Sequence, residues 1–450
     1  SVLDTTLRDG AQREGISLSV KDKLRIVQKL DELGVAYIEG GYAGSNPKDA
    51  EFFRRARSLG LRHARLAVFG NTRRAELPVK DDANIQAMLE AGVPVAVVVG
   101  KSSPMHVRDV LRTTLVENLA MIHDSVAYLS ESGMEVLFDA EHFFDGYKLD
   151  PAYALETARV AAEAGARCVV LCDTNGGSMP LEVMDAVAAV HSALPGVQLG
   201  IHAHNDTGVA VANTLVAVQA GTTHVQGTIN GYGERCGNAD LCAVIPDLQL
   251  KMGCQALANG DLSLMTQASR FVSEIANLRP DDNAPYVGRS AFAHKAGLHV
   301  SAILKNVNSY QHTDPDLVGN KMRVLVSELS GKSSIAHKLD ELPLEVALGA
   351  DEIRELAQRV KVLESQGFQF EGAEGSFELL VRRAQPDYRQ PFEVLDFLVL
   401  VEKRVDKAML AEATVKARVD GKIMHTAAEG DGPVNALDRA MRKAPEPFYP

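Results

Sequence analysis

The first 255 residues alternate between short apolar runs and longer segments in which apolar residues recur at helical spacing. In the segment 21–33, for example, Leu24, Val27 and Leu30 fall on one helical face. The short runs are apolar at nearly every position and end in turn residues, which is typical of strands buried on both faces of a parallel sheet. We predict eight such strands, over residues 2–5, 37–39, 65–69, 94–99, 135–138, 168–172, 198–202 and 224–228.

Eight strand–helix units in this length favour an α/β fold built on a TIM (β/α)8 barrel. The alternative is an open, doubly wound sheet, whose first strand–helix turn would carry the glycine pattern G-x-G-x-x-G. That pattern is absent after the first predicted strand. Polar or charged residues follow nearly every strand, and a closed barrel would bring all of them to one mouth.

After the barrel, residues 256–285 have a helical pattern and residues 313–365 indicate a small helical subdomain. From residue 368 onward, strands are predicted at 376–382, 392–401 and 413–419, followed by a helix at 433–442. We therefore divide the chain into a catalytic barrel (1–280), a linker and helical subdomain that contributes to the active site (281–365), and a C-terminal α+β domain (366–450). The sequence stops at Pro450 directly after one helix, so we expect this last domain to be incomplete.

Composition narrows the class of protein without naming a function. Apolar residues make up 46% and charged residues 24%, as in ordinary globular proteins, and the net charge of −12 argues against nucleic acid or an anionic membrane as partners. The five cysteines form no C-x-x-C pair, and no apolar run approaches the roughly 18 residues of a membrane span. These features favour reduced thiols and a cytoplasmic location.

Two distant segments suggest a metal site. Arg8 and Asp9 follow the first strand, and His202 and His204 lie two residues apart at the end of the seventh, so both rings project to the same side. Arg8 and Asp9 alone would suggest a surface salt bridge. Together with the two histidines, however, Asp9 completes a plausible set of ligands for a divalent ion, with Asn238 as a fourth. The sequence does not choose among Zn, Mn, Co and Mg.

Other strand ends carry candidate acid, base and binding groups. Glu39 could form a structural ion pair that orients Arg8. Glu141 lies among aromatic residues, where burial would raise its pKa toward that of a general acid or base. Thr174 could bind a substrate carboxylate or cap a helix. His294 and His299 lie beyond the barrel, and we expect at least one of them to fold back over its mouth.

Four motifs resemble those of the DRE-TIM metallolyase superfamily. They are Asp4-Thr-Thr-Leu-Arg-Asp-Gly10, Glu39 on the second strand, His202-Ala-His-Asn-Asp206, and Gly231-Tyr-Gly-Glu-Arg-Cys-Gly-Asn238. The segment 291–300 and the C-terminal domain resemble the branch that condenses acyl-CoA with 2-oxo acids, which contains the 2-isopropylmalate, homocitrate and citramalate synthases. Lyase and aldolase relatives lack that domain.

The stretch Glu39-Gly-Gly-Tyr-Ala-Gly-Ser-Asn-Pro-Lys-Asp49 is similar to the corresponding stretch of the (R)-citramalate synthases. The resemblance implies an acyltransferase that joins acetyl-CoA, pyruvate and water into (R)-citramalate and CoA, on the pyruvate route to isoleucine. It implies Arg8, Glu141, His299 and Tyr310 as catalytic residues. It implies Arg8, Asp9, Glu39 and Thr174 as substrate-binding residues, and Asp9, His202, His204 and Asn238 as metal ligands. The alternatives are a larger 2-oxo acid, as in 2-isopropylmalate or homocitrate synthases, a lyase or aldolase, and a catalytically silent relative.

The C-terminal stretch Ala427-Ala-Glu-Gly-Asp-Gly-Pro-Val-Asn-Ala-Leu437 is similar to the regulatory, LeuA-type dimerisation domain of the same branch. This similarity implies a homodimer and an isoleucine effector. Because the domain is expected to be incomplete at Pro450, we expect the 450-residue form not to respond to isoleucine.

Overall fold

The computed structural model describes residues 1–44, 46–327, 332–341, 348–385, 387–403, 405 and 409–449. The chain divides into two compact units, one made of residues 1–293 and 307–323 and the other of residues 294–306 and 324–450. The division into 1–280, 281–365 and 366–450 stays a prediction, because these units do not test it.

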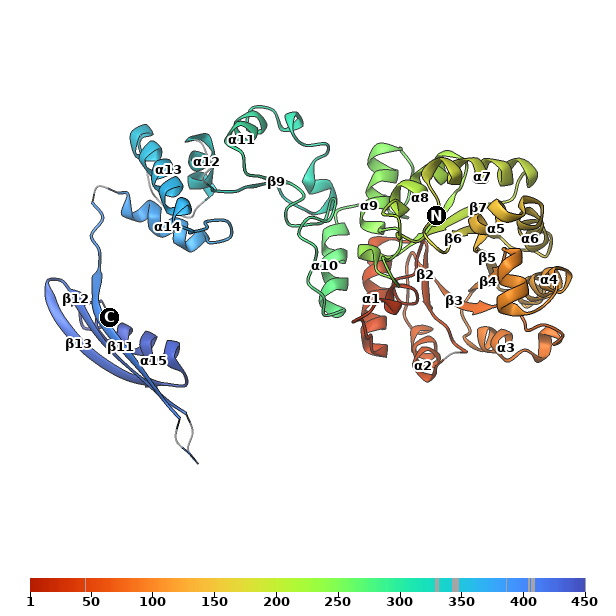
Figure 1. Cartoon of the computed structure of the whole chain (residues 1–450), viewed down its shortest axis with the longest axis horizontal. Helices are drawn as coiled ribbons and strands as arrows, with labels where there is room; N and C mark the ends of the chain where they lie inside the picture. Colours follow the sequence, from red (N-terminus) through yellow and green to blue (C-terminus); the bar gives the residue numbers. More distant parts are fainter. Residues whose placement is uncertain are drawn as a thin grey trace. The chain divides into compact units, whose positions relative to one another are not determined.

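Eight parallel strands close the barrel of the first unit, as predicted (Figure 1). Each pairs with the next along the chain, and β1 pairs with β8 to complete the ring. The strands are β1 (Val2–Asp4), β2 (Tyr37–Gly41), β3 (Arg65–Asn71), β4 (Val95–Lys101), β5 (Glu135–Glu141), β6 (Cys168–Asp173), β7 (Leu199–Ala203) and β8 (His224–Gly227). Strands β4 and β5 run beyond their predicted ends, which brings Lys101 into register with Glu141.

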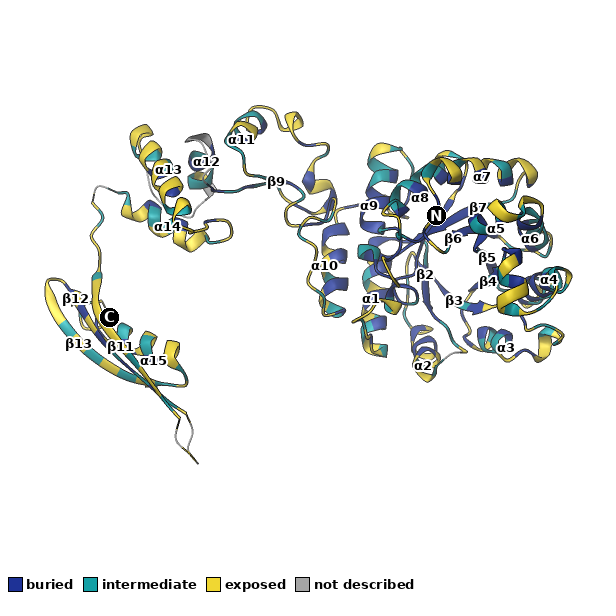
Figure 2. Cartoon of the chain, viewed as in Figure 1, coloured by how far each residue is buried: buried dark blue, intermediate teal, exposed yellow. Residues whose placement is uncertain are grey.

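Helices surround the strands, with their apolar faces turned inward (Figure 2). The first begins at a capping box between Ser19 and Asp22 and ends at Gly34, whose φ of 93° suits a glycine. The barrel helices are α1 (Val20–Leu33), α2 (Pro47–Ala56), α3 (Ala83–Glu90), α4 (Leu115–Glu131), α5 (Phe143–Leu149), α6 (Pro151–Glu163), α7 (Pro180–Ala193), α8 (Ala210–Gln219) and α9 (Leu241–Pro246).

The barrel interior is filled by side chains rather than open. Leu3, Val97, Leu137 and Val170 belong to one apolar cluster inside the strands. Two of the next inward positions toward the carboxyl ends of the strands are polar, Thr5 after Leu3 and Asp139 after Leu137, and ligands bind at this end of the barrel in this fold.

The helical prediction for residues 256–285 is mostly wrong. Only α10 (Met265–Ile275) is helical there, and it packs against α1. Gly260 and Asn277 adopt left-handed backbone conformations, with φ of 68° and 54°, which a continuous helix does not allow. Turn formation by Asn and Gly therefore outweighs the apolar spacing.

Among the described residues of the second unit, four helices precede its three-stranded sheet: α11 (Gly297–Ile303), α12 (Lys332–Glu341), α13 (Ala350–Ser365) and α14 (Glu374–Arg383). The strand predicted at 376–382 is wrong, because this segment lies within α14. Phe377 and Val381 are four residues apart and are both buried in a cluster with Leu356 and Val360 of α13. Packing against α13 thus selects the helical period. A short two-stranded sheet, β9 (Ala293–His294) with β10 (Arg323–Val324), lies where the two units join along the chain.

An antiparallel sheet in the order β11-β12-β13 follows α14 in the sequence. Its strands are β11 (Phe392–Glu402), β12 (Leu410–Val419) and β13 (Lys422–Gly430), and helix α15 (Pro433–Lys443) packs on β12 and β13. The third strand was not predicted. Most of β11 is exposed, including Phe397, Leu398 and Leu400 (Figure 2).

Across the described part of the chain, no helix is both long enough and apolar enough to cross a bilayer. All five cysteines are free thiols, three of them buried.

Candidate active site

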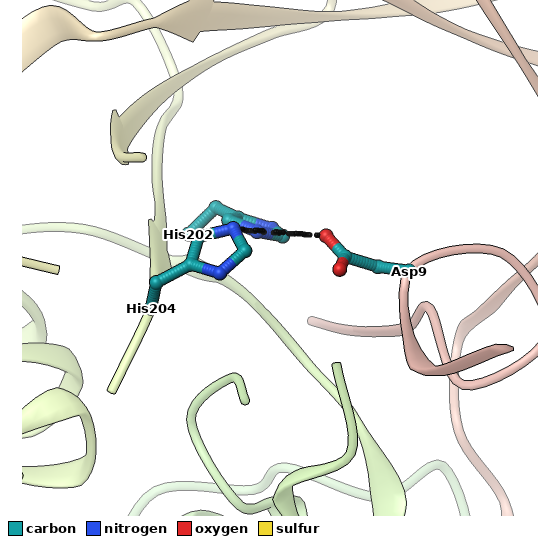
Figure 3. A group of neighbouring side chains, drawn as sticks. All are labelled: Asp9, His202 and His204. Atoms are coloured by element: carbon teal, nitrogen blue, oxygen red, sulfur yellow. Dashed lines mark hydrogen bonds and ion pairs between the residues drawn. The ribbon is translucent and has the colours of Figure 1, made fainter. Parts of the chain in front are cut away.

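Asp9, His202 and His204 converge at the carboxyl end of the barrel (Figure 3). Oδ2 of Asp9 lies 3.4 Å from Nε2 of His202 and 3.8 Å from Nε2 of His204, and the two ring nitrogens are 3.3 Å apart. All three residues are buried. Three ligand atoms therefore face one another at a distance that a single divalent ion could bridge, which is the arrangement predicted from the sequence.

The charges of the three groups suit a cation. Although burial opposes ionisation, the Arg8 guanidinium holds the pKa of the Asp9 carboxyl well below its usual range. Burial, and then the positive charge of His202, lower the pKa of His204 to about 4. At neutral pH this site therefore offers a carboxylate and at least one neutral imidazole, the forms that bind metals.

Asn238 adjoins the three ligands and offers a further oxygen. It follows the glycine-rich loop after β8, and its Nδ2 donates to Oδ1 of Asp9 over 3.1 Å. Its own amide oxygen is buried and finds no hydrogen-bond partner among the described residues. A buried acceptor without a partner is costly. An ion at this place would satisfy it, so the donor set fits a divalent metal.

Arg8 is held in place from several sides. Its Nε donates to Oε2 of Glu39 over 2.7 Å, its Nη1 lies 3.2 Å from Oδ2 of Asp9, and its guanidinium carbon lies 4.0 Å from the ring centre of Phe69. Thr5 also donates to Glu39 through its hydroxyl. Glu39 is fully buried, so its carboxylate orients Arg8, as expected from the sequence.

The stretch 39–49 runs from the end of β2 through a short connection into the first turn of α2, and its Ser45 lies outside the described residues. The Asp49 carboxylate accepts hydrogen bonds from the backbone of Tyr42 and from Lys23. Gly41 has a φ of 146°, and a Cβ there would lie 2.5 Å from Oδ2 of Asp49. The glycine is thus needed for the loop to close on Asp49, and the loop presents Tyr42 to the cavity.

A cavity of about 590 Å³ opens at this end of the barrel. Charged residues that line it are Arg8, Asp9, Lys23, Lys48, Asp49, Lys101, Glu141, His204, Glu234 and Arg235. Its remaining lining residues include Tyr42, Phe69, Asn71, Val99 and Thr174. A pocket of this size and mixed polarity suits a small charged substrate together with part of a larger one.

Glu141 differs from the expectation that aromatic side chains would bury it. Its side chain is 24% exposed, lines the cavity and forms an ion pair with Lys101 of the neighbouring strand. The aromatic residues Phe143 and Phe144 that follow it pack into the core instead. The chain reverses at His142, whose φ of 57° is left-handed, so the strand end and the aromatic residues point to different places.

Thr174 also lines the cavity, and its hydroxyl is already oriented. The backbone N–H of His142 donates to Oγ1 of Thr174 over 2.8 Å. Because Oγ1 accepts this bond, the hydroxyl hydrogen of Thr174 points in another direction. It remains available to donate to a ligand in the cavity. Thr174 does not cap α7, which begins only at Pro180.

The prediction missed several residues at the site. Arg235, within the glycine-rich loop, forms an ion pair with Asp206 and donates to the backbone oxygen of Thr174. Asp139 and Gln226 lie inside the barrel next to His202. The alternation of side chains along a strand could have revealed Asp139 and Gln226, because each lies two residues from another inward-facing residue. Each would then be a polar residue at an inward position of an otherwise apolar strand.

His299 and Tyr310 are not tested by this geometry. His299 lies on α11 of the second unit, and Tyr310 lies in the segment 307–323 of the first. Their assignment to the acid–base set, and the approach of His294 or His299 to the barrel mouth, stay predictions.

Comparison with known proteins agrees with this geometry. The HMGL-like family model matches residues 1–272. Residues 286–367 match the homocitrate synthase post-HMGL domain-like model, and residues 371–446 match the LeuA allosteric (dimerisation) domain. The barrel also resembles a solved HMG-CoA lyase of Bacillus subtilis, with a TM-score of 0.53 and 20% identity over 62% of this chain and 94% of that one, which supports the fold alone.

Relatives that align with nearly the whole of this chain indicate which members of the family it resembles most in sequence. An (R)-citramalate synthase of Geobacter sulfurreducens is 51% identical over 448 residues, covering 99% of this chain and 85% of the relative. A 2-isopropylmalate synthase of Methanocaldococcus jannaschii is only 32% identical over 445 residues, covering 98% of this chain and 82% of the relative. The chain belongs to the HMGL-like family and, within it, to the (R)-citramalate synthases.

Proposed function

We propose that this chain condenses acetyl-CoA with pyruvate and water, giving (R)-citramalate and CoA. The observation that carries the proposal is the convergence of Asp9, His202 and His204 beside the fixed guanidinium of Arg8, at the edge of a cavity. The 51% identity to an (R)-citramalate synthase supports the choice of reaction. The product is a precursor on the pyruvate route to isoleucine.

The metal site would hold the 2-oxo acid. Asp9, His202, His204 and Asn238 would bind a divalent ion, either Zn, Mn, Co or Mg, which supplies Lewis acidity toward the carbonyl oxygen of the substrate. Arg8 lies next to Asp9 and would therefore lie close to that oxygen. Its charge would stabilise the oxygen as negative charge develops on it, and Glu39 keeps the guanidinium aimed there.

Thr174 would bind the carboxylate of pyruvate. Its hydroxyl accepts from His142 and can therefore donate to an anion in the cavity. A charge-assisted hydrogen bond of this kind fixes the orientation of the substrate as well as binding it. The carbonyl carbon of pyruvate would then face the remainder of the cavity, where acetyl-CoA enters.

Glu141, His299 and Tyr310 would share the proton transfers. A base removes a proton from the methyl group of acetyl-CoA, and the resulting carbanion equivalent forms a bond to the carbonyl carbon of pyruvate. The carbonyl oxygen gains the electron pair and then a proton. Water cleaves the thioester, releasing the CoA thiol and a second carboxylate. The position of Glu141 in the cavity lining, paired with Lys101, supports its part in these transfers.

The side chains around the cavity support a small 2-oxo acid. Tyr42 and Phe69 pack edge to face, with ring centres 5.8 Å apart, and Asn71 donates to the hydroxyl of Tyr42. This fixed group leaves little freedom for a larger side chain on the substrate. We therefore favour pyruvate over the substrates of 2-isopropylmalate or homocitrate synthases.

Release of the CoA thiol, measured with acetyl-CoA and a panel of 2-oxo acids, tests the proposal. We expect pyruvate to exceed 2-oxoisovalerate and 2-oxoglutarate, since steric exclusion typically contributes about 10- to 200-fold per small group. Equal or faster turnover of 2-oxoisovalerate would contradict citramalate synthesis. Matched assays without any 2-oxo acid measure simple hydrolysis of acetyl-CoA.

We also propose that the chain forms a homodimer and binds an effector through its C-terminal domain. The match of residues 371–446 to the LeuA allosteric (dimerisation) domain supports both. The apolar side chains exposed on β11, among them Phe397 and Leu398, are suited to contact a second copy. Isoleucine as the effector and a cytoplasmic location stay predictions.

A further inference from the structure

Two buried polar residues connect opposite parts of the barrel directly beside His202. Gln226 on β8 donates from Nε2 to Oδ1 of Asp139 on β5 over 3.0 Å. Strands β5 and β8 are not neighbours in the barrel, so this hydrogen bond crosses its interior. Both residues are buried. The other end of the Gln226 amide, Oε1, lies 2.9 Å from Nδ1 of His202.

The orientation of the Gln226 amide sets the direction of the hydrogen bonds among the three groups. An amide has one donor end and one acceptor end, and Asp139 offers an acceptor to the donor end. A carboxylate can only accept, and the carbonyl oxygen of a protonated carboxyl also accepts, so Nε2 of Gln226 can donate to Asp139 in either form. In this orientation the acceptor end of Gln226 faces His202, whose Nδ1 then carries the hydrogen.

The consequence appears at the opposite side of the ring. With its hydrogen on Nδ1, a neutral imidazole has a lone pair on Nε2. Nε2 of His202 is the atom that faces Asp9 and His204 (Figure 3). The other tautomer would direct an N–H at the point where the three ligands meet.

The surroundings make a purely structural role for this pair expensive. The inward position before Asp139 on its strand is Leu137, which lies in an apolar cluster with Val97 and Val170. Burying an amide and a carboxyl at such a place costs free energy that an apolar side chain would not. This cost to the stability of the fold is expected where the buried polar pair serves the site above it.

We propose that Asp139 and Gln226 are positioning residues of the metal site, which hold the imidazole of His202 in the tautomer that presents Nε2 to a divalent ion. This inference rests on the metal site of the proposed function. Neither residue touches the substrate. Both act through His202, in the way that outer partners of metal-bound histidines set ligand orientation and basicity.

Titration of the metal-free full chain with Co²⁺, followed by its visible absorption, tests the inference without an activity assay. We expect Gln226→Leu to raise the dissociation constant for Co²⁺ by about 10- to 100-fold, as loss of such partners typically does. Gln226→Glu keeps an acceptor for His202 but sets a carboxylate against Asp139. We therefore expect it to weaken Co²⁺ binding as well.

The double variant Asp139→Asn/Gln226→Glu gives the sharpest test. It exchanges donor and acceptor between the two positions, since the new asparagine amide can donate to the new glutamate and the glutamate can still accept from His202. We expect it to bind Co²⁺ more tightly than Gln226→Glu alone. Restoration of this kind depends on the direction of the hydrogen bonds and would not follow from packing.

Val97→Ala serves as the matched control, because it removes buried volume from the same barrel interior without touching the pair. Equal Co²⁺ affinity in Gln226→Leu and wild type would overturn the inference. So would an equal loss in Val97→Ala, or a double variant that binds no better than Gln226→Glu. If Gln226→Leu does not fold, the comparison of Gln226→Glu with the double variant still decides. Failure of wild type itself to bind Co²⁺ would instead contradict the metal site.

Discussion

Nε of Arg8 donates a 2.7 Å hydrogen bond to Oε2 of Glu39, a carboxylate that is fully buried. The two residues belong to the first two strand–helix units, and their bond sets the direction of the guanidinium beside Asp9. The ring of Phe69 packs against the same guanidinium. An oriented cation of this kind stabilises developing negative charge without having to reorganise during the reaction.

Arg8→Lys should therefore be nearly as damaging as loss of the charge. A lysine ammonium cannot donate to Glu39 and lie beside Asp9 with the geometry of a guanidinium fork. We expect kcat for CoA release to fall by about 10²- to 10³-fold, as for loss of an oxyanion donor. Arg13→Lys, which changes a nearby arginine that stacks on Tyr232, is the control. Comparable kcat in both variants would contradict the role of Arg8.

Chelation should abolish CoA release, and a divalent ion should restore it. His202→Ala, His204→Ala and Asp9→Asn each remove one of the three converging ligand atoms, so each should weaken metal binding. Elemental analysis of dialysed protein, together with assays under added Zn, Mn, Co or Mg, measures both effects. Full activity in protein shown to be metal-free would refute the site.

Glu141→Gln should lower kcat by about 10²- to 10⁴-fold, the usual contribution of a general acid or base, while KM for pyruvate changes little. The same assay applied to His299→Ala and Tyr310→Phe tests the other members of the set. Glu182→Gln, which alters an exposed partner of Lys148, is a suitable control. A variant that keeps wild-type kcat would lose its assigned role.

The free energy of unfolding should decrease as the pH is lowered from 7 to 5, because of His224. Burial lowers the pKa of this histidine to about 3 in the folded barrel. An unfolded histidine titrates near pH 6.5, so below that pH only the unfolded chain binds the proton and the free energy of unfolding decreases. Between pH 7 and pH 5 the loss from this residue should be about 2 kcal/mol.

Denaturant unfolding at these two pH values, followed by circular dichroism, measures this dependence. His224→Phe keeps a ring against Tyr37 but cannot take up the proton. The decrease in its free energy of unfolding between pH 7 and pH 5 should therefore be smaller than that of wild type by about 2 kcal/mol. His123→Gln changes an exposed histidine and should leave the dependence as it is. An unchanged slope in His224→Phe would refute the assignment.

Phe397→Asp should shift the chain from dimer toward monomer. Phe397 is 57% exposed on β11, and an apolar residue at an interface loses its contact when it becomes charged. Sedimentation velocity at several protein concentrations measures the shift. Val434→Asp, at an exposed site on α15, controls for added charge alone. A dimer equally stable in both variants would place the interface elsewhere.

The sequence by itself determined the barrel and most of its strands, because burial on both faces leaves a pattern that each strand shows locally. It also indicated that His202 and His204 share one side, since alternation along a strand needs no knowledge of other strands. The motif 39–49 could be recognised in the sequence, but the hydrogen bond from the backbone of Tyr42 to Asp49 could not be predicted from it. For residues 256–285 and 376–382 the local pattern misled, because turns in one case and packing on α13 in the other outweighed it.

Only the tertiary structure decided which side chains meet across the barrel. The approach of Asp9 to His202 and His204 depends on closure of β1 against β8. The pairing of Lys101 with Glu141 depends on the register of two strands, and the hydrogen bond from Gln226 to Asp139 depends on the width of the barrel. Local periodicity fixes which face a side chain occupies, but its partner is set by how the strands close, and a single strand carries no information about that closure.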